Sequence, residues 1–167
     1  MDEKTEILNY VRERYIEEQG RFRHFEDKCS KLVKSLTIVI AVFCGIVSFK
    51  SATLLSPTTE IQWINLFLCS LSFFALFCAW GHSMRALRIG EFPIAAKSRK
   101  NAEYILNAKP KDAFDQIFDC YVDATEKAHS VIDEKSINLE HAYDEMILGS
   151  SVLVISIFLT VIMEIFK

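Results

Sequence analysis

The sequence predicts an all-α membrane protein with three transmembrane helices and a cytoplasmic, coiled-coil-like helical stalk. Two observations support this fold class. Hydrophobic residues make up 51% of the chain and charged residues 25%, and the two kinds lie in separate, alternating stretches, as in multi-pass membrane proteins. The charged stretches contain few glycines or prolines, and their apolar residues recur at the period of an α-helix.

Residues 1–34 are predicted to form a cytoplasmic helix that runs without a break into a first span over residues 35–55. Gly20 is expected to weaken or slightly kink it, because a glycine inside a helix costs about 1 kcal/mol. Lys50, near the far end of the span, is expected to reach the lipid head groups. Apolar residues spaced by three and four positions form a packing seam on one face of the helix; it includes Leu8, Val11, Tyr15, Phe22 and Phe25.

A second span is predicted over residues 61–81. Trp63 and Trp80 lie near its two ends, as aromatic residues do at membrane interfaces. The loop before it, residues 56–60, is so short that the first two spans must form an antiparallel hairpin.

Residues 82–109 are predicted to form a basic cytoplasmic connector with a short helix, a bend at Gly90 and Pro93, and a second helix from about residue 94 to residue 107. Because the connector lies beside a membrane exit, its basic side chains are assigned to anionic lipid head groups. Binding of a nucleotide phosphate or of RNA is the alternative. The candidate contacts are Arg85, Arg88, Lys97, Arg99 and Lys100.

Residues 110–146 are predicted to form an acidic cytoplasmic helix that continues into a third span over residues 147–166. Pro110 suits the first position of a helix. Gly149, the only glycine that follows, is expected to be the point where the cytoplasmic and membrane parts could move independently. The seam of this helix includes Phe114, Phe118, Tyr121, Ile132 and Leu139.

Lysine and arginine residues are concentrated in residues 1–34 and 83–148, whereas the loop between the first two spans has none. The positive-inside rule therefore places the N-terminus and the middle region in the cytoplasm and the C-terminus outside. Both seam helices then run toward the membrane, parallel to each other. The stalk is expected to pack within a protomer, between protomers, or both.

Each predicted span carries small or polar residues at helical spacing. Such residues let helices approach closely in lipid, so helix–helix contact is one interpretation. The other is a water-lined path in an oligomer, with Glu164 as an outer acidic ring. The candidate pore-lining or helix-contact residues are Thr37, Cys44, Ser48, Asn65, Cys69, Ser72, Ser156, Thr160 and Glu164.

The sequence offers little for catalysis. Glu126-x-x-His129 is half of a di-iron helix motif, but the sequence has no second copy, so a solvated helix face is preferred. His24, His82 and His141 are interpreted as standing alone, and the five cysteines as packing residues. We therefore expect a protein that is not an enzyme and has no cofactor and no metal. The net charge of −3 gives no reason to expect direct binding of nucleic acid.

The order of features resembles the small three-span bacterial membrane effectors of anti-phage systems. These features are Phe25-Glu26-Asp27-Lys28-Cys29 before the first span, the tight hairpin, and a helix that ends Glu134-Lys135-x3-Leu139-x2-Ala142-Tyr143. The Pycsar transmembrane effectors have a pre-membrane motif, Asp-x-Lys-Ala-Ser/Gly, that is similar to Asp27-Lys28-Cys29-Ser30. The stretch Tyr121…Glu126-Lys127-Ala128-His129…Asp133 also resembles the Tyr…Asn-His…Asp stretch of the two-span SLATT effectors, with alanine in place of asparagine.

This resemblance implies a defence effector that oligomerises and impairs the bacterial inner membrane when an infection signal arrives. The implied partners are the lipid bilayer, further copies of the chain, and a cytoplasmic defence protein or a nucleotide second messenger. The parallel seams and the polar stripes agree with a homo-oligomer that forms or opens a pore. The alternative is a membrane scaffold that recruits and regulates a soluble partner through its stalk.

Overall fold

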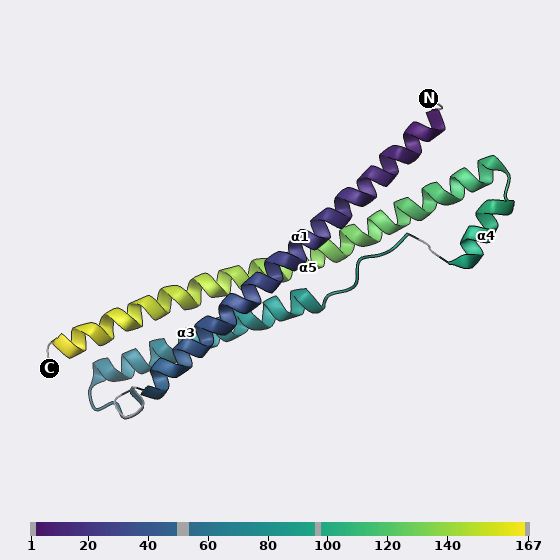
Figure 1. Ribbon diagram of the computed structural model, residues 1–167. Helices are drawn as coiled ribbons and strands as arrows, with labels where there is room; N and C mark the ends of the chain where they lie inside the picture. Colours follow the sequence, from purple (N-terminus) through teal and green to yellow (C-terminus); the bar gives the residue numbers. More distant parts are fainter. Residues whose placement is uncertain (1–2, 50–53, 96–97, 166–167) are drawn as a thin grey trace. The chain divides into compact units, whose positions relative to one another are not determined.

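The computed structural model describes residues 3–49, 54–95 and 98–165. These residues form helices and connecting segments, without a β-strand among them, so the all-α prediction is confirmed. Figure 1 shows the helices in chain order. They are α1 (Glu3–Phe49), α3 (Glu60–Arg88), α4 (Arg99–Asn107) and α5 (Pro110–Ile165).

Three of these helices, α1, α3 and α5, are long and apolar enough to cross a membrane, which confirms the prediction of three such helices. At most 28% of the most apolar stretch of any of them is buried within the protein. The rest of that apolar surface needs lipid or another protein surface to cover it, because in water it would favour association. Lys50 and the adjoining end of the predicted first span lie outside the described residues.

The chain forms two compact units. The first unit consists of residues 1–27 and 89–136, and the second of residues 28–88 and 137–167. Helices α1 and α5 each contribute to both units, whereas α4 belongs to the first unit and α3 to the second. Helix α1 is continuous through Gly20, so the predicted weak point does not interrupt it.

In the first unit, aromatic side chains join α1, α5 and the extended connector. The Tyr15 ring centroid lies 5.4 Å from that of Phe92 and 5.5 Å from that of Tyr121, and the Phe22 and Phe92 centroids are 5.4 Å apart. Further along both helices, Phe22 meets Lys135. The contacts follow the same order along α1 and α5, so the two helices run parallel within this unit.

The connector differs from the prediction. Helix α3 continues without a break from the second apolar stretch to Arg88, and Gly90, with φ of +45°, follows its end in the left-handed conformation typical of helix termini. The next helix begins at Arg99 and not near residue 94: residues 91–95 are not helical, and Ser98, which caps the helix, has an extended backbone. The Tyr15 hydroxyl donates to the Pro93 carbonyl (3.2 Å) and accepts from the Ala95 N–H (3.4 Å).

Helix α4 starts where its sequence supplies a cap. The Ser98 hydroxyl accepts a hydrogen bond from the Asn101 N–H at 3.1 Å, which satisfies one of the donors left open at a helix N-terminus. On the other side, the Gln116 amide of α5 donates to the Asn101 side-chain oxygen at 3.2 Å. The start of the helix is therefore set by a capping serine, which the prediction overlooked.

In the second unit, small residues bring α3 and α5 close together. A Cβ atom on Gly149 would lie 3.0 Å from Leu76 Cγ, 3.1 Å from the Leu76 backbone nitrogen and 3.2 Å from Ala75 Cβ. Helix α5 passes through Gly149 without interruption. The glycine is needed here because a side chain would collide with α3, and independent movement of the two parts at Gly149 stays a prediction.

Candidate functional site

The polar residues of α3 and α5 meet inside the second unit. The Ser72 hydroxyl donates to the Gly149 carbonyl at 2.7 Å. The Asn65 side chain accepts from the Ser156 hydroxyl at 2.7 Å and donates to the Thr160 hydroxyl at 3.0 Å. An amide buried among apolar side chains must be hydrogen-bonded, since an unpaired one costs about 1–3 kcal/mol. These contacts therefore fix the register of α3 against α5.

Three of these side chains are almost completely shielded from solvent. Asn65 is 2% exposed, Ser156 1% and Ser72 0%. The Cys69 sulfur completes the cluster, 2.9 Å from the Ser156 hydroxyl. Of the candidate pore-lining or helix-contact residues, these four and Thr160 make helix contacts within one chain. We call Asn65, Cys69, Ser72, Ser156 and Thr160 the polar ladder.

The candidates on α1 are placed differently. The Thr37 hydroxyl donates to the Val33 carbonyl (2.8 Å) and accepts from the Trp80 indole N–H (3.1 Å), which links α1 to α3. Cys44 and Ser48 are exposed and line an apolar groove of about 480 Å³ between α1 and α3. Glu164 is exposed near the end of α5. Within the chain, the polar ladder thus makes more polar contacts between helices than Thr37, Cys44 and Ser48 do.

The candidate head-group contacts that the structure describes are divided between the two units. Arg85 and Arg88 are exposed at the end of α3, in the second unit. Arg99 and Lys100 are exposed in α4, in the first unit, where Arg99 pairs with Glu103 at 2.8 Å. Lys97 lies outside the described residues.

The seam residues lie toward the interior of their units. In the first unit Val11, Phe22 and Ile132 are buried, and in the second Leu139 is 4% exposed. The remaining seam residues are partly buried: Leu8, Tyr15, Phe25, Phe114, Phe118 and Tyr121.

Lys135 occupies the same face of α5 as the seam and is fully buried. Its ammonium nitrogen lies 4.5 Å from the centroid of the Phe22 ring and 3.5 Å from Glu26 Oε1. A cation over an aromatic face is stabilised by the ring quadrupole, and the carboxylate adds a charge of opposite sign. Removing either partner would leave a poorly compensated buried charge, which is strongly destabilising.

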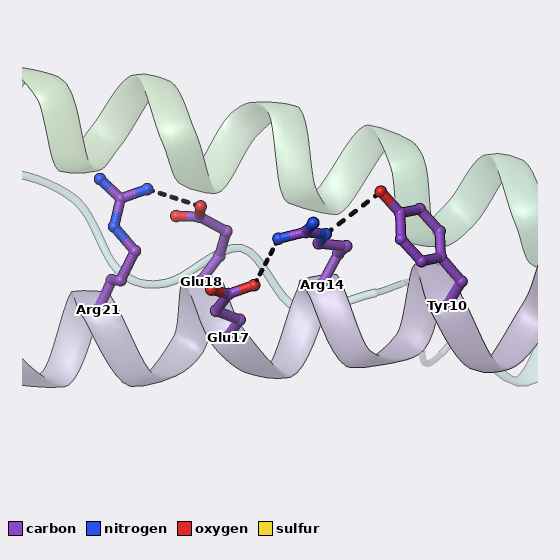
Figure 2. A network of polar contacts seen from close by, with 5 residues as sticks. All are labelled: Tyr10, Arg14, Glu17, Glu18 and Arg21. Carbon is purple, nitrogen blue, oxygen red and sulfur yellow. Dashed lines mark hydrogen bonds and ion pairs between the residues drawn. The ribbon is translucent and has the colours of Figure 1, made fainter.

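One face of α1, beside α5, carries several charged and polar side chains (Figure 2). The Arg14 guanidinium pairs with Glu17 at 2.8 Å and donates to the Tyr10 hydroxyl at 3.3 Å. Hydrogen bonding to Tyr10, and secondarily to Glu17, raises the pKa of Arg14 above its ordinary value, so its charge does not change at physiological pH. Arg21 pairs with Glu18 at 2.7 Å. The Arg14–Glu17 pair is exposed and contributes little stability, whereas the Glu18 side chain is only 16% exposed.

Two histidines that the sequence analysis treated as isolated lie next to each other. The rings of His82 (α3) and His141 (α5) are 5.6 Å apart between centroids, and His82 Nε2 lies 3.6 Å from Glu145 Oε1. That interpretation is therefore wrong for His82 and His141. They are far apart in the chain, and only the packing of α3 on α5 brings them together.

The half-motif Glu126-x-x-His129 lies on an exposed face of α5, where His129 Nε2 is 3.5 Å from Asp133 Oδ2. Among the residues that the structure describes, no group of three histidine, cysteine, aspartate or glutamate side chains is arranged to hold a metal ion. No protein-family model, no curated protein and no solved structure matches the chain.

Replacing Asn65 by leucine should weaken the packing of α3 on α5 by about 1–2 kcal/mol, because Ser156 and Thr160 lose their partner across the interface. Circular dichroism of the protein in detergent would measure this as a lower unfolding midpoint. The control is Ser70→Ala, since Ser70 is exposed and donates only to the Leu66 carbonyl of its own helix. Similar losses in both variants would contradict the role given to the polar ladder.

Proposed function

We propose that this protein is a non-enzymatic, homo-oligomeric effector of the bacterial inner membrane. The first unit receives a signal, and the apolar helices of the second unit then form or open a pore or otherwise disrupt the bilayer. The observation that carries the proposal is the continuity of α1 and α5, which each extend from the first unit into an apolar stretch of the second. A change in the packing of the first unit has a direct covalent route to the membrane helices.

The burial of the polar ladder makes α3 and α5 less suitable than α1 to line a path for ions. Asn65, Ser72 and Ser156 are buried in contacts within the protomer and are not accessible to water. Thr37, Cys44 and Ser48 are exposed on α1; Cys44 and Ser48 line the groove beside α3, and Thr37 contacts Trp80. In an oligomer, α1 is therefore the helix proposed to face the path or the neighbouring copy.

The arrangement in the cell follows from the positive-inside rule, with the N-terminus and the middle region cytoplasmic and the C-terminus outside. The lipid head groups would then contact Arg85 and Arg88, which are exposed at the end of α3. The likeness to Pycsar transmembrane effectors motivates a role in anti-phage defence. The trigger would be a nucleotide second messenger or a cytoplasmic defence protein that acts on the first unit.

The test is to express the chain in bacteria and to follow the membrane potential with a voltage-sensitive dye during phage infection. We expect depolarisation in infected cells and its loss in the double variant Cys44→Leu and Ser48→Leu. The control is Ser151→Leu, an exposed position on α5. An unchanged membrane potential in infected cells, or a monomeric mass in detergent, would contradict the pore.

A membrane scaffold is the second candidate, and one observation favours it. The polar side chains of α3 and α5 are bonded to each other within the protomer, and most exposed residues of these stretches are apolar, as suits an anchor in lipid. Exchanging residues 35–55, 61–81 and 147–166 for three unrelated spans separates the two candidates. A scaffold would keep its function after the exchange, whereas a pore would lose it.

A further inference from the structure

We infer that His82, His141 and Glu145 form a proton-responsive clasp between α3 and α5, which packs these helices more tightly when His82 is protonated. His141 and Glu145 are one turn apart on α5 and so point to the same side. His82 approaches them from α3, with its Nε2 atom 3.6 Å from Glu145 Oε1 and its ring 5.6 Å from that of His141. All three residues belong to the second unit.

The clasp contains polar atoms without hydrogen-bond partners. His82 Nδ1 and Glu145 Oε2 are both buried and unbonded. The 3.6 Å contact between Nε2 and Oε1 is longer than an ordinary hydrogen bond. With a neutral imidazole, the buried Oε2 atom of the partly exposed Glu145 carboxylate has no hydrogen-bond donor, and a buried polar atom without a partner lowers stability.

A proton on His82 changes this contact. The imidazolium donates from both ring nitrogens and carries a positive charge, so its contact with Glu145 becomes an ion pair across the two helices. The side chains of His82 and Glu145 are 35% and 31% exposed, so the proton can come from solvent while the pair remains partly shielded from it. Histidine is the side chain that ordinarily gains a proton between pH 8 and pH 5.

The neighbouring groups determine the sign of the effect. Cys78 lies one turn before His82 on α3, within electrostatic range of Glu145. Arg85 of α3, Asp144 of α5 and Lys34 of α1 are exposed, so solvent and salt screen their charges. Helix α1 contacts this level of α3 through the hydrogen bond between Trp80 and Thr37. A second proton, on the exposed His141, would oppose the first through repulsion, so the clasp is tightest when it carries one.

This inference goes beyond the proposed function, because it concerns the packing of two helices and not the permeability of a membrane. It makes that packing respond to the pH of the solution that reaches the end of α3. The described donors are not arranged to hold a metal ion, which leaves the proton as the ligand.

The experiment compares the thermal midpoint of the full chain in detergent at about pH 6 and about pH 8, with a metal chelator present throughout. The wild-type protein should unfold about 2–4 °C higher at the lower pH. A partly exposed ion pair that adds about 1 kcal/mol to the free energy of unfolding would shift the midpoint of a chain of this size by that amount. His82→Gln and Glu145→Gln should each abolish the difference. His129→Gln, in the first unit and away from the clasp, should retain it.

Two outcomes would overturn the clasp. One is a higher midpoint at about pH 6 than at about pH 8 in both His82→Gln and Glu145→Gln; the other is a wild-type midpoint that is equal or lower at about pH 6. If one variant fails to fold, the other still decides the question, because each removes one side of the same contact. His141→Gln adds a further check: with the repelling group removed, the difference between the two pH values should persist or grow. Its loss would also overturn the assignment.

Discussion

Leu139→Asp is expected to prevent the protein from folding and assembling. Leu139 is 4% exposed, on the face of α5 that also buries Ile132 and Ala142. An aspartate there would place a charge among apolar side chains. The expected loss of stability is about 4 kcal/mol or more, at the upper end of what single substitutions cause. Light scattering on the protein in detergent would show aggregates or unfolded chain in place of a defined oligomer.

The matched control for this prediction is Asp119→Lys. Asp119 is exposed on the opposite side of α5, so exchanging its negative charge for a positive one should leave both the mass and the unfolding midpoint nearly unchanged. Surface substitutions usually alter stability by no more than about 0.5 kcal/mol. Equal damage from both variants would mean that the buried face of α5 has been assigned incorrectly.

Gly149→Leu is expected to separate α3 from α5. Even a single Cβ atom at this position would lie 3.0 Å from Leu76 Cγ and 3.1 Å from the Leu76 backbone nitrogen, and the backbone atom cannot move without displacing the helix. The hydrogen bond from Ser72 to the Gly149 carbonyl would be lost with the contact. We expect a cost of about 3 kcal/mol or more, which lowers the unfolding midpoint by about 6–12 °C.

Gly45→Leu provides the comparison, because a Cβ atom on Gly45 meets no other atom within 4 Å. Replacing this helical glycine should leave the midpoint equal or slightly higher, since leucine is the better helix former. If α1 contacts a neighbouring copy, Gly45→Leu should lower the mass in detergent without lowering the midpoint. A loss of stability as large as that of Gly149→Leu would contradict the close approach described for Gly149.

Local patterns were sufficient for the helices and their buried faces. The spacing of Ala128, Ile132, Lys135, Leu139 and Ala142 follows the period of an α-helix, and all five are buried. Such patterns were less reliable at the connector. Pro93 correctly indicated a break, but the Tyr15 hydroxyl holds the following backbone extended and Ser98 caps the next helix. That tyrosine lies far away in the chain, so no local window contains the interaction.

What the amino-acid sequence determined by itself is which segments are helical, which are apolar enough to cross a membrane, and which face of each helix is buried. These properties depend on residues within a few turns of one another. Only the tertiary structure decided the partners: Asn65 with Ser156 and Thr160, Gly149 with Leu76, and His82 with Glu145. Each of these contacts depends on how far one helix is shifted along another. That register is set by the packing of all the side chains between the helices. The spacing of residues along either helix does not predict it.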